Sequence, residues 1–365
     1  IFMPAILPYF VPGFDSVKLA QTVPLARTLL LSPIFFAISY VLGGVLNAHK
    51  KFFAYALAPL VYNLSIIVGG FLSPWFGVAG VAWTVVIGSF LHVLIQLPVL
   101  TQLKYRYSFV FDLKDPSLRK VIRLMIPRSV SLAMGQIVLI FFTRIGSLLP
   151  SGAVSIFALT NNIQTTPVAI FASSIATAVF PLLGEATSEA NNERFRTLLT
   201  NSLKGILFYI IPSMILLWVF RAHIIRLYLA LNHQTWTDTI RAIDTFGWFI
   251  FSLPAQGVTM IIIRAFYAKQ NTKSPMYIAF ASGLISVVLA WLLVSVYQDV
   301  PALAAAYTVG AIFEAIILFI LFSVRYSQSI NFSSLGESLV AALGLSAIAG
   351  LSARITLSIV SEGRA

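Results

Sequence analysis

The chain has 365 residues, of which 59% are hydrophobic and only 10% are charged, and its formal net charge is +12. Soluble globular proteins carry about 25% charged residues, so this composition indicates a membrane protein. The basic residues lie in short connections between apolar runs, which excludes a continuous phosphate-binding surface for nucleic acid. The sequence has no cysteine, no Walker A loop and no histidines at metal-ligand spacing, and it predicts no metal site and no cofactor.

Apolar runs long enough to cross a bilayer as helices recur along the whole chain. They predict about eleven transmembrane helices, the first of them partial, at residues 1–12, 23–46, 53–73, 78–102, 124–149, 153–183, 199–220, 243–264, 275–297, 302–323 and 336–359.

Charge fixes the expected orientation of these helices. The connections after the second, fourth, sixth, eighth and tenth runs are basic, whereas those at 73–75, 148–152 and 297–301 carry no Lys or Arg. The positive-inside rule therefore places the basic set in the cytoplasm. The exceptions lie in the two longer connections on the other side, and they are Lys18, Arg27, Arg221, Arg226 and Arg241.

An internal repeat is visible at a fixed offset. LNAHKKFFAYALAPLVYNLSII begins at Leu46 and resembles FYAKQNTKSPMYIAFASGLISVV, which begins 220 residues later at Phe266. VAWTVVIG from Val81 resembles AAYTVGAI from Ala305 at a similar offset. Six runs separate the copies, so both keep the same orientation, and transporters built from such parallel repeats place a substrate site at the repeat interface. The first copy lacks two helices of the second, so we expect the chain to be a fragment.

These patterns predict an all-α polytopic membrane protein with two parallel-repeat six-helix lobes, the first incomplete, and an additional C-terminal helix. The expected domains are a partial N-terminal lobe at 1–103, a cytoplasmic connection at 104–122, a C-terminal lobe at 123–326, and the additional helix with its tail at 327–365.

The stretch TNNIQTTPVAIFASSIATAVFPLL, residues 160–183, places amides and hydroxyls inside an apolar run. A buried amide without a partner costs about 1–3 kcal/mol, so Asn161, Asn162 and Gln164 are not expected to face lipid. Asn161, Gln164 and Thr165 share one face of a helix. The amides either bridge neighbouring helices, at about 0.6 kcal/mol each, or line a hydrated cavity that takes a polar headgroup. The density of polar groups in one turn favours the cavity.

Four further residues inside the runs carry expectations. Pro167 frees a backbone carbonyl and is a candidate hinge. Arg144 lies near the outer end of its run and either reaches the interface or points into a cavity. Glu314 lies mid-run, where a lone carboxylate costs about 2.5–3.5 kcal/mol, and it predicts either a structural pairing or an ion or proton path. Arg264 lies near a cytoplasmic end, which favours an anchoring role.

Several motifs of the sequence resemble those of a known family. The run IRLMIPRSVSLAMGQIVLIFFTRIGSLLPSGAVSIFALTNNIQTTPVAIFASSIATAVFPLLGEATSE is similar to the seventh and eighth helices of the lipid II flippases (the MurJ/MviN family), members of the multidrug/oligosaccharidyl-lipid/polysaccharide (MOP) exporter superfamily. The MIPR turn, the region of Gln136 and TRIGSLLPSGAVS carry this likeness. PWFGVAGVAW and FYAKQNTKSPM support it, and it spans essentially the whole chain, from the family's third helix to its thirteenth.

The resemblance implies a transporter of the bacterial inner membrane, not an enzyme, that flips an undecaprenyl-type lipid-linked peptidoglycan precursor by alternating access between two lobes during cell wall biogenesis. It implies membrane lipids as partners and leaves a coupling ion open. The candidate substrate-cavity residues are Asn161, Asn162, Gln164, Thr165, Arg144 and Gln136. The arginine that some members carry on their eighth helix aligns with Asn162, and an amide adds no Coulomb attraction for phosphate.

Three alternatives stay open. The same architecture exports other lipid-linked oligosaccharides or amphipathic compounds, although exporters of cations are expected to have more mid-run acids than Glu314 alone. A membrane-embedded lipid-carrier enzyme would need paired carboxylates, for which Asp112 and Asp115 come nearest, but these residues favour a solvated loop and a helix cap. In a non-transporting scaffold for cell-wall machinery, the amides would only hold helices together.

Overall fold

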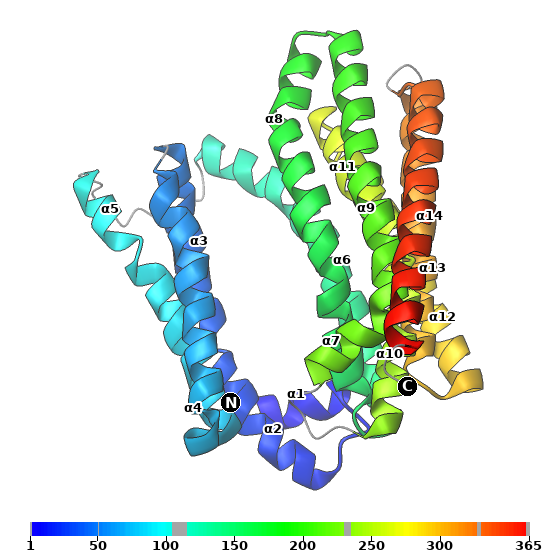
Figure 1. The fold of residues 1–365 in the computed structure, drawn as a ribbon. Helices are drawn as coiled ribbons and strands as arrows, with labels where there is room; N and C mark the ends of the chain where they lie inside the picture. The colour runs from blue at the N-terminus through cyan, green and yellow to red at the C-terminus, as the bar shows by residue number, and fades with distance from the viewer. Residues whose placement is uncertain (1, 50, 104–114, 230–234, 327–329, 363–365) are drawn as a thin grey trace. The chain divides into compact units, whose positions relative to one another are not determined.

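The computed structural model describes residues 2–49, 51–103, 115–229, 235–326 and 330–362, and these residues form helices without strands (Figure 1). The chain divides into two compact units, Ile1–Lys114 and Asp115–Ala365, and each is described by itself. The boundary falls inside the connection predicted at 104–122. Asp112, considered above for an enzyme, lies outside the described residues.

The described residues of the first unit form five helices. They are α1 (Met3–Phe10), α2 (Ser16–Leu29), α3 (Ser32–Ala48), α4 (Phe52–Leu94) and α5 (Leu97–Gln102). The long α4 is interrupted at Gly77, whose φ of 60° and ψ of −163° are not helical and suit a residue without a Cβ. This interruption lies where two separate apolar runs were predicted, 53–73 and 78–102.

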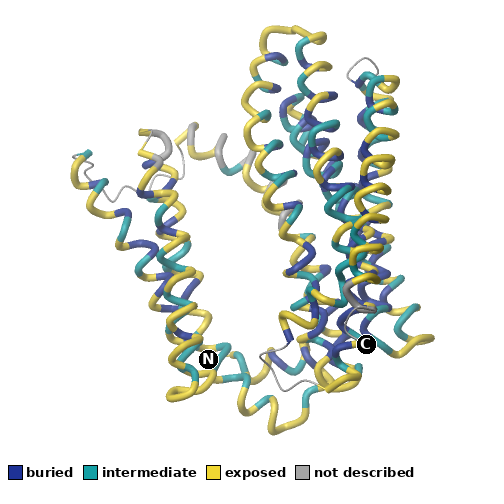
Figure 2. The backbone as a smooth tube through the Cα atoms, in the orientation of Figure 1, coloured by how far each residue is buried: buried dark blue, intermediate teal, exposed yellow. Residues whose placement is uncertain are grey.

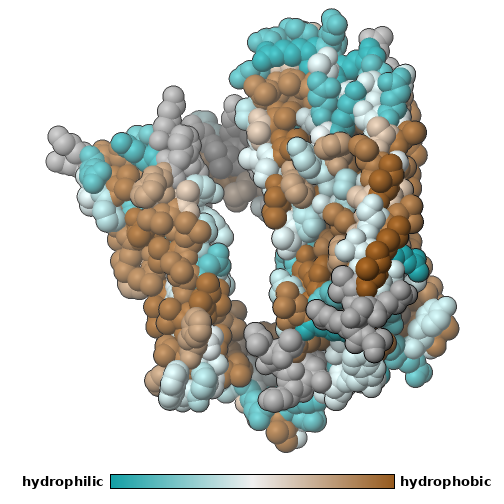
Figure 3. All heavy atoms as spheres, in the orientation of Figure 1, coloured by the Kyte–Doolittle hydropathy of each residue, from teal (hydrophilic) through white to brown (hydrophobic). Residues whose placement is uncertain are grey.

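The second unit contains the remaining elements. They are α6 (Pro116–Gly146), α7 (Ala153–Pro167), the π-helical turn η1 (Val168–Ala172), α8 (Ser173–Ser188), α9 (Asn192–Leu229), α10 (Trp236–Ile250), α11 (Leu253–Ala268), α12 (Lys273–Tyr297), α13 (Pro301–Arg325) and α14 (Phe332–Glu362). α6 begins earlier than expected, inside the predicted connection. Hydrophobic side chains cover the length of the helices, and hydrophilic ones gather near the α8–α9 turn (Figure 3).

Within the described residues, seven helical segments are long and apolar enough to cross a membrane, and α10 with α11 makes an eighth if the two form one broken span. One of the seven, Phe53–Gln102, holds the two predicted runs on either side of Gly77. Together with the short α1 and the apolar part of α6, Ala133–Gly146, these segments account for the predicted apolar runs.

The apolar run predicted at 243–264 comprises parts of two helices, because α10 and α11 meet at a bend of 41°. Pro254 explains the break: a proline lacks the N–H that would bond the carbonyl four residues earlier, and its ring clashes there. That residue is Ile250, where α10 ends. Pro33 acts in the same way on α2, which ends at Leu29.

Aromatic side chains form part of the core of the second unit. The Phe142 ring of α6 lies 5.6 Å from the Phe157 ring of α7, which lies 5.3 Å from the Phe249 ring of α10. Phe249 in turn contacts the Tyr307 ring of α13 at 5.3 Å. Figure 2 shows buried residues along the inward faces of these helices. These ring contacts connect α6, α7, α10 and α13.

Candidate polar cavity in the second unit

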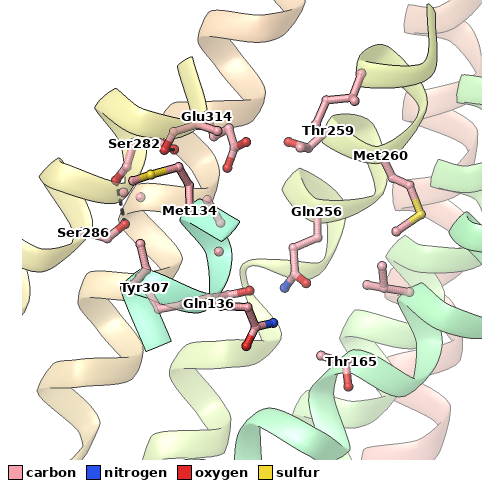
Figure 4. Close-up of a pocket in the computed structure, with 18 of the residues that line it drawn as sticks. Met134, Gln136, Thr165, Gln256, Thr259, Met260, Ser282, Ser286, Tyr307 and Glu314 are labelled. Carbon is pink, nitrogen blue, oxygen red and sulfur yellow. Dashed lines mark hydrogen bonds between the residues drawn. The ribbon is translucent and has the colours of Figure 1, made fainter. Parts of the chain in front are cut away.

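A cavity of about 720 Å³ lies inside the second unit, between α6, α7, α8, α11, α12 and α13 (Figure 4). Small-molecule sites typically enclose about 300–1,000 Å³. The polar part of its lining consists of Gln136, Asn161, Thr165, Thr177, Gln256, Thr259, Arg264, Tyr267, Ser282, Ser286, Tyr307 and Glu314. The walls from α7, α8, α12 and α13 belong to candidate membrane spans, α11 belongs to the bent pair with α10, and α6 contributes its apolar part, Ala133–Gly146. The cavity therefore offers hydrogen-bonding groups among apolar helices.

A chain of amides forms one edge of the cavity. Gln164 is fully buried, and its Nε2 donates to Asn161 Oδ1 at 3.1 Å. Its Oε1 accepts from Gln256 Nε2 of α11 at 2.9 Å, and the same Gln256 nitrogen donates to Ser252 Oγ at 2.7 Å. Gln164 therefore bridges α7 and α11, while Asn161 and Gln256 at its two ends line the cavity. The position of Gln164 fits an amide that bridges neighbouring helices, whereas the position of Asn161 fits an amide that lines a cavity.

The acidic end of the cavity lies on α13. Glu314 of α13 and Ser282 of α12 both line this end, and the Ser282 hydroxyl donates to the Ala279 carbonyl at 3.1 Å. Among the described residues no basic group lies within ion-pair distance of Glu314. Ser286, one turn further along α12, also lines the cavity and donates to the Ser282 carbonyl at 2.8 Å. Figure 4 shows Glu314 and these serines on one side and Thr259 and Gln256 on the other.

A cation lines the same cavity from α11. Arg264 Nη1 donates to Thr177 Oγ1 of α8 at 2.9 Å and to the Ser173 carbonyl at 3.5 Å. The position of Arg264 near a helix end favoured an anchoring role in the sequence analysis. Neither Arg264 nor Gln256 was predicted to line a cavity. The sequence did contain a signal: Gln256, Met260, Ile263, Arg264 and Tyr267 recur at three- and four-residue spacing, and all of them line the cavity.

The structure separates the candidate residues of the sequence into two groups. Gln136, Asn161, Thr165 and Glu314 line the cavity. Gln164 is buried behind it, and Asn162 and Arg144 are exposed elsewhere on α7 and α6. What any of them does in transport stays a prediction.

Pro167 sits at a change of helix type. α7 ends at Pro167, and the next five residues form the π-helical turn η1 before α8 continues. π-helical turns are rare and frequently occur at functional sites. Val168 and Ala172 of the turn are buried, and a Cβ added to Gly257 of α11 would lie 3.9 Å from Ala172 Cβ. The widened turn places Val168 in the cavity wall.

Comparison with known sequences gives a consistent result. A family model described as lipid II flippase MurJ matches residues 1–362. The lipid II flippase MurJ of Burkholderia cenocepacia is 28% identical over 82% of this chain and 60% of its own length. A probable lipid II flippase MurJ of Bdellovibrio bacteriovorus is 27% identical over 88% of this chain and 62% of its own. The chain thus spans about three fifths of the length of these relatives.

Solved structures share the fold. A lipid II flippase MurJ in an inward closed conformation aligns with a TM-score of 0.78 and 22% identity, covering 98% of this chain and 78% of that one. An inward-facing multidrug resistance MATE transporter of the MOP superfamily aligns with a TM-score of 0.78 and 17% identity, covering 89% and 76%. At these identities the likeness establishes a common architecture of membrane helices.

Proposed function

This chain belongs to the lipid II flippase MurJ family, and from that premise we propose that it takes part in flipping lipid II, the lipid-linked peptidoglycan precursor, across the bacterial inner membrane. The transport is by alternating access, the substrate is an undecaprenyl-type lipid carrying a sugar–pyrophosphate head, and the protein catalyses no covalent chemistry.

The observation that supports this proposal most directly is the polar cavity among membrane-spanning helices. Asn161, Gln136 and Thr165 supply amide and hydroxyl groups that both donate and accept hydrogen bonds, as sugar hydroxyls require. Arg264 supplies a cation that suits a pyrophosphate oxygen. A headgroup crossing the bilayer beside these residues exchanges its bonds with water for bonds with protein.

We further infer that Glu314 binds the coupling cation or proton. It is the one acid among the residues that line the cavity, and no basic group of the described residues lies within ion-pair distance of it. A carboxylate at this depth is costly unless it is protonated or binds a cation, so its occupancy depends on the ion supply on each side of the membrane.

Expression of the full-length gene to which this sequence belongs, in a bacterium depleted of its own lipid II flippase, tests the proposed substrate. We expect growth and normal cell shape to be restored, because the cell then regains a route for its cell-wall precursor. Immunoblotting of membranes confirms that the protein is present. If the protein accumulates in the membrane and the cells still lyse, lipid II is not its substrate, and export of another lipid-linked oligosaccharide becomes the better assignment.

A further inference from the structure

A second cavity of about 350 Å³ lies in the second unit, away from the one just described. It is lined by Trp218, Arg221, Asp244, Gly247, Trp248, Phe251 and Pro301, which come from α9, α10 and the start of α13. Pro301 is the first residue of a membrane-span candidate, so the cavity opens where that span ends. The orientation predicted from charge places this end on the outer side of the membrane.

One wall of this interfacial pocket is cationic and aromatic. The Arg221 guanidinium lies 4.2 Å from the centroid of the Trp218 ring, and its Nη1 donates to the Trp218 carbonyl at 2.8 Å. The Trp218 ring contacts the Phe251 ring at 4.7 Å. A guanidinium carries five N–H donors, so others remain to bind an anion. The stacking holds the cation in place without neutralising it.

The opposite charge comes from α10. Asp244 is exposed, and within the described part of the chain its carboxylate forms no ion pair, neither with Arg221 nor with any other base. The neighbouring base, Arg241, instead contacts Asp299 at 3.3 Å and Asp238 at 4.0 Å. The pocket therefore presents a positive and a negative group that do not satisfy each other. A ligand that carries both charges a short distance apart complements it.

Space between these groups depends on Gly247. A Cβ at this position would lie 3.2 Å from Trp218 Cζ3 and 3.7 Å from Arg221 Cδ. A larger side chain would fill the pocket from its floor and displace the stacked guanidinium. The glycine thus keeps open a volume that falls in the usual range of small-molecule sites, about 300–1,000 Å³.

We propose that this pocket binds the headgroup of a zwitterionic phospholipid, in which a phosphate lies next to a primary or quaternary ammonium. The phosphate binds the free N–H groups of Arg221. The ammonium lies against Asp244 and over the Trp248 ring, where cation–π attraction adds to the ion pair. Trp218, Trp248 and Phe251 are 37%, 49% and 42% exposed, which suits contact with acyl chains at an interface. This site is independent of the proposed flipping activity.

Binding of two short-chain lipids to the purified full chain in detergent tests the proposal. Phosphatidylethanolamine carries both charges, and phosphatidylglycerol of identical acyl chains lacks the ammonium. With intrinsic tryptophan fluorescence as the readout, we expect phosphatidylethanolamine to bind at least about tenfold more tightly. Asp244→Asn should reduce this ratio to about one, because it removes the partner of the ammonium. Arg221→Gln should weaken both lipids, and Gly247→Leu should abolish binding.

Arg226→Gln is the matched control. Arg226 also lies over a tryptophan, at 5.3 Å from the Trp236 ring, but neither residue lines the pocket. This variant should bind both lipids as the unmodified protein does. Equal affinity of the unmodified protein for the two lipids would overturn the proposal, as would an unchanged ratio in Asp244→Asn, whose exposed position leaves folding intact. Binding of free O-phosphoethanolamine as tight as that of the lipid would overturn the assignment to a membrane lipid.

Discussion

Gln164 and Asn161 lie three residues apart on the same helix and have different surroundings. Gln164 is buried with both ends of its amide bonded, whereas Asn161 accepts one of those bonds and borders the cavity. Movement of Asn161 or Gln256 away from Gln164 would leave the buried Gln164 amide without a partner, which costs free energy. The bonds of Gln164 therefore hold Asn161 and Gln256 in position. The residues that face the cavity are held in place by one that does not.

Gln164→Leu should lower the free energy of unfolding by about 1–2 kcal/mol, since it leaves Asn161 and Gln256 without their shared partner. Denaturant or thermal unfolding of the purified protein in detergent measures this. Asn162→Leu is the control, because Asn162 is exposed and its substitution should change the value by no more than about 0.5 kcal/mol. An equal decrease in the free energy of unfolding in the two variants would show that the hydrogen bonds of Gln164 do not stabilise the protein.

Glu314→Gln should abolish rescue of flippase-depleted cells while leaving the protein level unchanged. Glutamine keeps the size of the side chain and can form hydrogen bonds, but it cannot ionise. Glu337→Gln, at an exposed position on α14, should rescue fully. If Glu314→Gln also rescues, the carboxyl has only a structural role and the coupling ion binds elsewhere.

At this scale the sequence predicted the polar character of residues 160–166 but not the role of each side chain. The partner of Gln164 is Gln256, 92 residues away in the chain, and only the packing of α7 against α11 brings the two together. Arg264 was missed for the same reason: its distance from a helix end suggested anchoring, whereas the face it occupies on α11 decides that it lines the cavity.

Helix contacts through small residues set the shape of the cavity at the scale of elements. A Cβ added to Gly310 of α13 would lie 1.7 Å from Ser286 Oγ and 3.0 Å from Ser286 Cβ of α12. Membrane helices approach closely through such residues, because lipid offers little hydrophobic drive for association. The close approach of α12 and α13 places Ser282 and Glu314 in the wall of the same cavity.

Gly310→Ala should therefore push α12 and α13 apart and lower the free energy of unfolding by about 1–3 kcal/mol. It should also weaken rescue, because Ser282 and Glu314 separate. Gly344→Ala provides the comparison: a Cβ there meets nothing within 4 Å, and a glycine-to-alanine change in a helix with free space stabilises by about 0.4–1 kcal/mol. Thermal unfolding of both variants measures the difference. A Gly310→Ala protein as stable as Gly344→Ala would show that α12 and α13 do not depend on close contact at Gly310.

The apolar runs predicted which segments form helices better than where those helices break. Hydrophobicity alone gave one helix at 243–264, whereas Pro254 ends α10 at Ile250. The proline was visible in the sequence, but a proline in a membrane helix leads to a kink, a π turn or a full break depending on what packs beside it. Pro167 illustrates a different outcome, since the helix there continues through η1.

The whole molecule is a polytopic helical membrane protein with the fold of the MOP transporters. Length, apolar composition and the order of short motifs were enough to predict that architecture and the family, because every bilayer-spanning backbone must satisfy its own hydrogen bonds as a helix. The arrangement of the two predicted lobes and the path of a headgroup through them require contacts that no apolar pattern encodes.

Water and a polar headgroup must reach the cavity of the second unit if the protein moves its substrate past these residues. Because the sequence has no cysteine, a single Thr165→Cys substitution gives one reactive position on its wall. Its labelling rate with a membrane-impermeant maleimide, compared with that of Ser346→Cys at a buried position on α14, is the most direct measurement. We predict rapid labelling of Thr165→Cys that lipid II slows and no labelling of Ser346→Cys. A Thr165→Cys protein that labels no faster than Ser346→Cys would contradict the claim.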